Sequence, residues 1–400
     1  MAGCPVLLPV AVTDRLYYTD AYLTRFDAHV TERTADGQRV CLDRTAFYPT
    51  SGGQPHDTGS LGRARVTDVV DEGDRIVHVL DAPLGESAVS GDVDWTRRFD
   101  HMQQHTGQHL LSAVFADLLG CETVSVHFGP DYATLDLGME AVTAGDILRV
   151  ETRANELVWE NRPVDVSFED AGSASGLRKV PEREGTLRVV TIRDLDRSAC
   201  GGTHVRATGE IGPILLRRQE KMKKTVRIEF LCGARAVRRA RADYDALSRI
   251  AAGMSASIDE LVTLVPAQTA EMRALQNAHR RVEEEVAAFR AAARYASTSA
   301  SHDGVRYFVE RRETGRAEEV RAFALAFASQ PRAVYAALLA ESRAVLLAAS
   351  DDSGFDCGGR LREALATVHG KGGGSRRLAQ GSVPDRAALD GVLAALGIAP

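Results

Sequence analysis

Histidines spaced four residues apart are the first feature of this sequence that could do chemistry. His105 and His109 are one turn apart in a predicted helix, so both rings would lie on one face and could bind one cation together. His101 stands four residues before His105 and gives a second pair in the same helix. The spacing predicts a metal-binding pair of histidines and leaves open which pair it is.

A second group of metal-binding side chains lies in the segment Cys200-Gly201-Gly202-Thr203-His204. The two glycines allow a tight turn, which would direct the thiolate and the imidazole to the same side. Three histidines and one cysteine suit zinc, a borderline-soft cation that accepts nitrogen and sulfur ligands. Two versions of the site stay open: four protein ligands with substrate nearby, or three ligands and a water molecule.

The elements that must position these segments follow from the apolar patterns. A helix over 99–119 carries the histidines, and Gly120 is its expected end. Residues 1 to about 95 alternate short apolar stretches with turn clusters, which predicts a β-rich region with a glycine-bearing loop over 48–55. The expected strands are 10–12, 39–42, 75–80, 124–128, 133–137, 164–168, 187–192 and 226–231, and a second helix is expected over 145–161.

From Ala234 the chain becomes rich in Ala, Arg and Glu, which predicts helix. Apolar residues there follow a three-four alternation that Gln268 and His279 interrupt; they are Ile258, Leu261, Val265, Met272, Leu275, Val282, Val286 and Phe289. This stripe predicts either a helix packed on its own domain, or a protruding arm or dimer zipper. The last hundred residues predict a small α/β unit, with strands 305–310, 334–339 and 344–348, helices 318–328, 360–368 and 386–396, and a glycine-rich loop over 369–377.

The overall composition is that of a globular protein. The chain has 400 residues and a net charge of −6, so any nucleic-acid-binding surface must be local. The six cysteines are scattered, as expected in a reducing compartment. There is no apolar run of about 18 residues and no basic segment at the start, so neither a membrane span nor a signal peptide is expected, and the predicted location is cytoplasmic.

Three stretches resemble, in order and spacing, the AlaX family of free-standing alanyl-tRNA editing proteins, relatives of the editing and C-terminal parts of alanyl-tRNA synthetase. They are 45–55, similar to the family's glycine-motif loop, and 104–111 and 198–205, similar to its paired zinc-ligand motifs. The stretch 370–381 is similar to the glycine-rich part of the DHH-associated C-terminal domain found in the long AlaX form. The resemblance covers nearly the whole chain and does not include an ATP-binding aminoacylation domain.

The resemblance implies an α+β protein of four parts. These are an N-terminal β-barrel with the glycine-motif loop (1–95), a zinc-binding editing domain (96–232), a helical arm (233–300) and a C-terminal α/β domain (301–400). It also implies that Zn²⁺ is bound by His105 and His109 rather than by His101, together with Cys200 and His204. The implied activity is hydrolysis of mischarged tRNA(Ala), with serine and also glycine as the amino acids removed.

Further site residues follow from the same resemblance. His127, on the strand after the histidine helix, is expected near the scissile ester, either to position it or to transfer a proton; the alternative is an exposed strand histidine. A pocket that selects serine needs a hydrogen-bond partner for the serine hydroxyl. Thr45, Thr50 and Gln54 are the candidates, and each is equally plausible as a loop-stabilising residue.

Contacts to tRNA are expected at basic clusters, because these neutralise phosphates. The first cluster is Arg217, Arg218, Lys221, Lys223 and Lys224, and the second surrounds the terminal glycines: Lys371, Gly372, Gly373, Gly374, Arg376 and Arg377. The glycine amides could meet RNA phosphates, since the pattern does not match a nucleotide-binding P-loop.

Two other functions fit the same residues. The site could pass the aminoacyl group from tRNA to a small molecule, which would make the chain a biosynthetic aminoacyltransferase. Alternatively, the zinc could be structural in a tRNA-binding module without catalytic activity. A homodimer through the helical arm and the C-terminal domain is a further expectation, which rests on the apolar stripe.

Overall fold

The computed structural model describes residues 12–179 and 185–398, and the chain divides into two compact units, Met1–Ile250 and Ala251–Pro400. The predicted α+β class is confirmed in its coarse form: the described residues form a closed barrel, four open sheets of two to five strands, and several helices. The four-part division by residue number stays a prediction. The predicted strand over 10–12 lies almost entirely outside the described residues. Among the described helices, none is long and apolar enough to cross a membrane.

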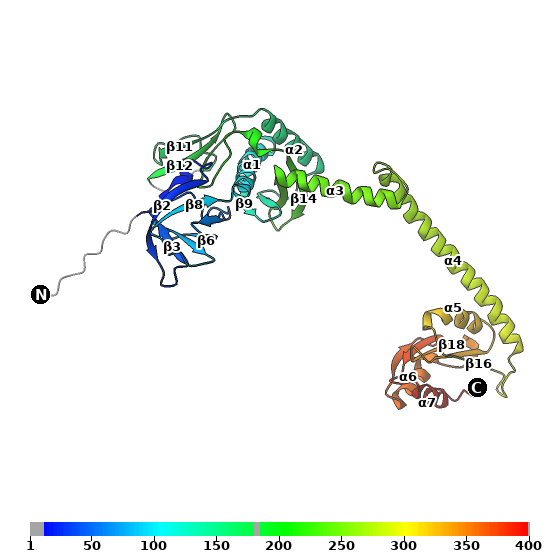
Figure 1. Cartoon of the computed structure of the whole chain (residues 1–400). Helices are drawn as coiled ribbons and strands as arrows, with labels where there is room; N and C mark the ends of the chain where they lie inside the picture. Colours follow the sequence, from blue (N-terminus) through cyan, green and yellow to red (C-terminus); the bar gives the residue numbers. More distant parts are fainter. Residues whose placement is uncertain (1–11, 180–184, 399–400) are drawn as a thin grey trace. The chain divides into compact units, whose positions relative to one another are not determined.

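The first unit begins with a closed β-barrel (Figure 1). Its strand order is β2-β3-β7-β6-β5-β8, and inward-facing apolar residues such as Leu42, Leu61 and Val69 fill it. The strands are β2 (Arg25–Arg33), β3 (Arg39–Leu42), β5 (Gly59–Leu61), β6 (Ala64–Asp71), β7 (Ile76–Leu80) and β8 (Ala88–Val93), with a short parallel pair, β1 (Asp14–Arg15) and β4 (Arg44–Thr45), beside them.

A buried histidine inside the barrel gives its stability a pH dependence. His78 is completely buried; its Nε2 lies 2.8 Å from Thr45 Oγ1 and its Nδ1 lies 3.3 Å from the Val40 carbonyl. Burial lowers the pKa of His78 to about 4. In the unfolded chain the ring binds a proton below about pH 6.5, whereas in the folded chain it stays neutral down to about pH 4. The folded state is therefore most stable relative to the unfolded state above about pH 6.5, and this advantage is lost as the pH falls toward 4.

We therefore expect the free energy of unfolding to fall by about 2 kcal/mol between about pH 7 and about pH 5 because of His78 alone. Urea unfolding of the wild type and of His78→Gln over this range measures the difference. The exposed His29 is the matched control, and His29→Gln should keep the wild-type dependence. Equal pH dependence in wild type and His78→Gln would contradict the assignment.

The rest of the first unit is built around helix α1 (Trp95–Leu119). This helix begins four residues earlier than predicted, because the Asp94 side chain accepts a hydrogen bond from the Arg97 amide and caps it. One sheet has the order β14-β15-β10-β9, with β9 (Thr123–Phe128), β10 (Ala133–Leu137), β14 (Ile214–Lys221) and β15 (Val226–Cys232). The second sheet is β11 (Val164–Asp170), β12 (Thr186–Ile192) and β13 (Asp196–Ala199), and α2 (Ala144–Trp159) shares the core with α1.

The region expected as a helical arm forms two helices. They are α3 (Ala234–Gly253), which follows β15 directly, and α4 (Leu261–Ser297). Helix α4 belongs to the second unit, and Ala291 near its end is buried against α5 (Ala317–Ala328).

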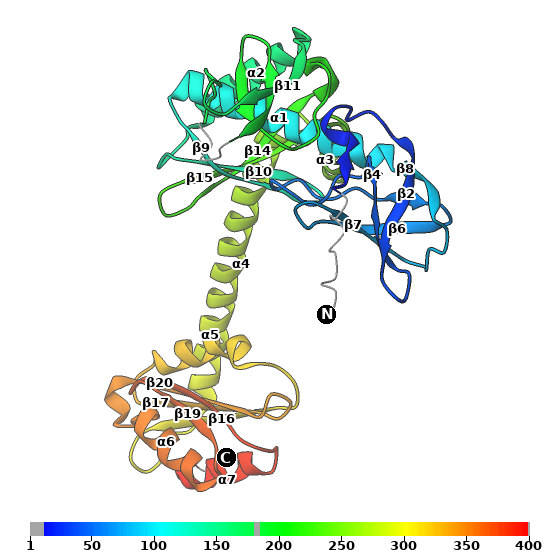
Figure 2. The same ribbon diagram turned by 90° about the vertical axis from the view of Figure 1, so that its left-hand side faces the viewer.

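The second unit is a five-stranded sheet with helices on both faces. Its order is β16-β17-β18-β20-β19, with β16 (Arg306–Arg312), β17 (Ala333–Leu339), β18 (Ala344–Ala349), β19 (Lys371–Gly374) and β20 (Leu378–Ser382). Helix α5 covers one face, and α6 (Cys357–Thr367) and α7 (Ala388–Leu396) cover the other (Figures 1 and 2).

The glycine-rich segment expected as a loop is strand β19, which corrects the prediction. Its backbone pairs with β20 from Lys371 to Gly374. A Cβ on Gly372 would lie 2.4 Å from the Gly381 Cα and 2.8 Å from Leu365 Cδ1. The glycine is therefore required for close packing of this edge strand, and part of its backbone is already hydrogen-bonded.

Candidate metal centre

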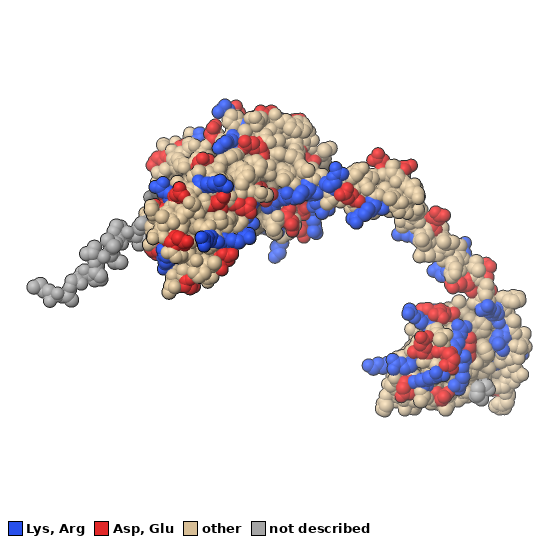
Figure 3. Space-filling view, viewed as in Figure 1, with Lys and Arg blue, Asp and Glu red and all other residues tan. Residues whose placement is uncertain are grey.

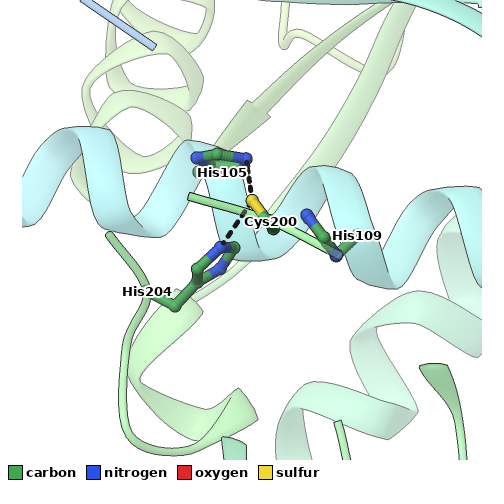
Figure 4. A group of neighbouring side chains, drawn as sticks. All are labelled: His105, His109, Cys200 and His204. Atoms are coloured by element: carbon green, nitrogen blue, oxygen red, sulfur yellow. Dashed lines mark hydrogen bonds between the residues drawn. The ribbon is translucent and has the colours of Figure 1, made fainter. Parts of the chain in front are cut away.

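Four side chains from two distant segments converge inside the first unit. His105 and His109 come from one face of α1, and Cys200 and His204 come from the turn that follows β13. Their ligand atoms all lie within 4.8 Å of one another. Cys200 Sγ is 3.4 Å from Nε2 of both His105 and His204 (Figure 4). Tetrahedral zinc with nitrogen and sulfur ligands requires ligand separations of roughly 3.5 Å, so this group could hold a divalent ion and its chemistry fits zinc.

Each histidine of the cluster is held through its other ring nitrogen. Nδ1 of His105 lies 2.8 Å from Gln54 Oε1, and Nδ1 of His109 lies 3.1 Å from Asp196 Oδ2. Nδ1 of His204 lies 3.1 Å from the hydroxyl of Thr106. With Nδ1 as the hydrogen-bond donor, Nε2 of each ring is left as the metal-binding atom. The outer partners therefore fix both the tautomer and the direction of the three rings.

The local electrostatics favour a thiolate at Cys200. Burial alone would raise the pKa of this thiol, but the adjacent rings of His105 and His204 hold it well below its usual value. Burial also lowers the pKa of His204 to about 3, which keeps this ring neutral. A thiolate and a neutral imidazole are the forms that bind a metal ion.

The turn that carries Cys200 is held tightly. A Cβ on Gly202 would lie 2.1 Å from Cε1 of His105, so only glycine lets the backbone approach the ring this closely. Nη1 of Arg188 donates to the carbonyls of Cys200 and Gly202 at 2.7 and 2.9 Å. Arg188 thus fixes the backbone between two of the ligands.

Sequence reasoning missed Asp196, Thr106 and Arg188. Asp196 also accepts hydrogen bonds from the Ser198 hydroxyl at 2.9 Å and from Arg178 Nε at 2.6 Å, and these two partners hold the carboxylate in place beside His109. A carboxylate four residues before a ligand cysteine was the available signal, but only the fold shows that it reaches the ring of His109, which is 87 residues away.

Replacing Asp196 with asparagine should weaken zinc binding by roughly 10- to 100-fold, because an outer partner of a metal-bound histidine typically contributes that much. Competition with a chromophoric chelator measures the affinity. Asp194 is the matched control: it lies in the adjacent turn with φ 56°, a conformation that asparagine tolerates, so Asp194→Asn should bind zinc like the wild type. Equal affinities for both variants would contradict the role of Asp196.

Of the three residues expected to select serine, one reaches the cluster. Gln54 is buried in the glycine-motif loop; besides His105, its amide binds the Thr203 backbone N at 3.1 Å and the Thr203 hydroxyl at 2.8 Å. Thr45 is buried in the barrel, where its hydroxyl meets His78. Thr50 is exposed, with its hydroxyl 3.1 Å from Nδ1 of His56.

His127 does not lie at the cluster, contrary to the prediction. Phe128 packs against His105, with ring centroids 5.2 Å apart, and Val126 joins the same core. Side chains alternate along a strand, so His127 points to the opposite face of the sheet. There its side chain is 62% exposed and lies 3.9 Å from Asp136. His101 is also outside the cluster: it is buried, and burial lowers its pKa to about 3.

The residues expected to bind tRNA lie in both units. The first cluster occupies the β14–β15 hairpin, where Arg217 pairs with Glu229 at 2.9 Å. Lys221, Lys223 and Lys224 at the hairpin end have no acidic partner within 4.0 Å among the described residues. In the second unit, Lys371 and Arg376 are exposed beside β19, and Arg377 lies 3.5 Å from Asp351.

Part of this site lies in a segment that matches a known protein family. Residues 187–229 match the family model of the threonyl and alanyl tRNA synthetase second additional domain. This segment includes Asp196, Cys200, His204 and strand β14. The fold and site therefore define a protein of the class that carries this synthetase-associated domain.

Relatives narrow the class further. The chain is 31% identical over 395 residues to the alanyl-tRNA editing protein AlaX-L of Pyrococcus horikoshii, an alignment that covers 93% of this chain and 95% of that protein. The chain belongs to the AlaX family of alanyl-tRNA editing proteins. It is also 37% identical over 256 residues to the alanine–tRNA ligase of Pyrococcus furiosus, across 59% of this chain but only 28% of the ligase. The C-Ala domain of Aquifex aeolicus alanyl-tRNA synthetase matches 25% of the chain at 20% identity, with a TM-score of 0.20.

Proposed function

We propose that this chain is a trans-editing hydrolase that deacylates mischarged tRNA(Ala), with Ser-tRNA(Ala) and Gly-tRNA(Ala) as substrates. The observation that carries the proposal is the convergence of His105, His109, Cys200 and His204 in a member of an editing family. The scissile bond is the ester between the amino acid and the terminal ribose. Water is the acceptor, in keeping with the editing relatives.

These four residues would hold Zn²⁺, which supplies a Lewis acid to polarise the ester or orient the substrate. The chain's own residues supply the orientation of that centre. Gln54 Oε1 accepts from both Nδ1 of His105 and the Thr203 backbone N–H, so one side chain of the glycine-motif loop holds the His105 ring and the Cys-Gly-Gly turn together. Gln54 and Asp196 are therefore positioning residues in this proposal. Esters are labile, so such orientation contributes a large part of the acceleration.

A panel of charged tRNAs tests the proposal. Ser-tRNA(Ala) and Gly-tRNA(Ala) should be hydrolysed and Ala-tRNA(Ala) spared; a chelator should stop the reaction, and added zinc should restore it. Failure to release serine and glycine from tRNA(Ala) would overturn the proposal. Release only after addition of a small-molecule acceptor would do the same, and would instead identify an aminoacyltransferase.

We also propose that α4 joins two copies of the chain. Its apolar stripe is exposed: Met272, Leu275 and Val282 are 57%, 64% and 57% exposed. The stripe keeps a three-four spacing with Gln268 and His279 at two of its positions, as in coiled coils whose polar core residues set the register. A second copy of the same helix is the occupant that matches this repeat.

Leu275→Glu should therefore convert a dimer into a monomer in light scattering, because it places a charge in the apolar seam. Asn277→Glu, two residues away on the opposite side of the helix, is the matched control and should leave the dimer intact. A monomeric wild type would contradict the proposed dimer.

A further inference from the structure

A groove on the first unit lies outside the metal centre. Three adjoining hollows of about 420, 490 and 510 Å³ share their lining residues. The first and second share Tyr132 and Glu229, and the second and third share Arg235 and Arg238. Together they extend from the solvent-facing side of the β9–β10–β15–β14 sheet, past the β9–β10 turn, to the start of α1. We infer that this groove binds the sugar–phosphate backbone of the tRNA acceptor stem, an inference that rests on the proposed function.

The positive charge of the groove is the first argument. Arg218, Arg238 and Arg97 line it, and none has an acidic partner within 4.0 Å among the described residues. Lys221, Lys223 and Lys224 lie on the same β14–β15 hairpin as Arg218. Of the five acidic lining residues, Glu229 is paired with Arg217 and Asp100 with Arg235. The other three, Asp94, Asp131 and Glu220, have no basic partner within 4.0 Å among the described residues, so the seven lining arginines leave an excess of two positive charges. Figure 3 shows Lys and Arg side chains gathering over β14 and α3, with acidic side chains among them. Unpaired guanidinium groups are what a phosphate backbone requires.

Two buried polar atoms in the groove have no partner. Thr134 is 7% exposed and lines the first hollow, and its Oγ1 makes no hydrogen bond. His101 is 5% exposed and lines the third hollow, and its Nδ1 makes none. Buried polar atoms are rarely left unpaired, so each one indicates a place where a ligand or water supplies the missing partner. A phosphate oxygen can accept a hydrogen bond from the Thr134 hydroxyl, and from His101 Nδ1 in the tautomer that protonates this atom.

Exposed aromatic rings give the groove a second feature of RNA-binding surfaces. Tyr132 is 48% exposed at the β9–β10 turn, between the first and second hollows. Trp95 is 37% exposed in the third hollow. Aromatic rings beside cationic groups stack on ribose and bases at single-stranded or frayed ends.

The groove is rigidly joined to the metal centre. Arg235 donates to the Gly129 carbonyl at 2.7 Å and pairs with Asp100 of α1, so one buried guanidinium connects the β9–β10 turn to the helix of His105 and His109. Phe128, the residue before this turn, packs on His105. The first hollow and the metal centre therefore lie on opposite faces of the same strands, with His127 on the groove side and Phe128 on the side of His105. His127, expected at the ester, lines this groove instead.

Charge reversal tests the inference. Arg218→Glu and Arg238→Glu should each raise KM for Ser-tRNA(Ala) and Kd for uncharged tRNA(Ala) about tenfold, and should reduce the slope of log Kd against log salt by about 1. Because neither side chain lies at the metal cluster, kcat, zinc content and thermal midpoint should stay unchanged. Arg63→Glu is the matched control: it reverses the charge of another exposed arginine, in the turn between β5 and β6 of the barrel.

The outcomes separate this inference from the proposed function. If the groove variants match Arg63→Glu in KM, Kd and salt slope while the wild type deacylates Ser-tRNA(Ala), the inference is overturned and the groove serves another partner. If the wild type hydrolyses no charged tRNA, the proposed function fails. Weaker tRNA binding by the groove variants would then still support the groove as an RNA-binding surface.

Discussion

The variant Cys200→Ala is expected to lose its zinc and to deacylate Ser-tRNA(Ala) at least about a thousandfold more slowly than the wild type, because a bound Lewis acid contributes several kcal/mol to the transition state. Cys200 supplies the anionic ligand of the group, and its thiolate is in contact with both His105 and His204. Without it, a divalent ion would be buried among neutral imidazoles, and the net charge would be costly to desolvate. Metal analysis per chain and single-turnover deacylation measure the two effects.

The matched control is Cys41→Ala, which removes a buried cysteine from β3 of the barrel. It should keep both zinc and activity. The fold of Cys200→Ala distinguishes a catalytic from a structural ion: retained circular dichroism with lost activity supports the proposal, and global unfolding supports a structural ion. A Cys200→Ala chain that deacylates at the wild-type rate would contradict a metal-dependent reaction.

Short-range spacing predicted the candidate ligands but left open whether His101 or His109 joins His105, and the family resemblance selected His109. The four-residue interval places His105 and His109 on one helix face, and the glycines between Cys200 and His204 permit their turn. The outer partners could not be predicted in this way, since Gln54 is 51 residues from His105 and Asp196 is 87 residues from His109. Only the packing of the barrel against α1, and of β13 beside it, brings them together.

Two errors have identifiable physical causes, the first readable from the sequence and the second only from the fold. Val126 and Phe128 alternate with Ser125 and His127, so the period of the strand already separates His127 from the apolar face that adjoins the buried metal centre. The glycines of β19 suggested a loop, because glycine is depleted from strands. Gly372 and Gly374 are needed there because the backbone of β20 approaches both too closely for a side chain, and Leu365 of α6 also approaches Gly372; this is a tertiary requirement.

The second large effect concerns the buried ion pair that joins the barrel to α1. Arg98 and Asp57 are both completely buried; Arg98 Nε lies 3.0 Å from each Asp57 oxygen, and Nη1 donates to the Ala21 carbonyl at 2.7 Å. Arg98→Met should lower the free energy of unfolding of the first unit by roughly 3–5 kcal/mol, because it leaves the Asp57 carboxylate buried without a counter-charge. Urea unfolding followed by circular dichroism measures the loss.

The double variant Arg98→Met/Asp57→Asn separates loss of the pair from loss of packing. It should be more stable than Arg98→Met, since the uncompensated charge is gone while the amide still has a carbonyl oxygen for the Tyr48 backbone N, which lies 2.6 Å from Asp57. A double variant less stable than Arg98→Met would mean that the unpaired charge of Asp57 is not the cause of the lost stability.

The same ion pair also affects the metal centre. Arg98 is seven residues before His105, about two helical turns, and Asp57 is three residues after Gln54. The pair therefore sets the distance between the glycine-motif loop and the histidine helix, so Arg98→Met should also weaken zinc binding through the Gln54–His105 contact.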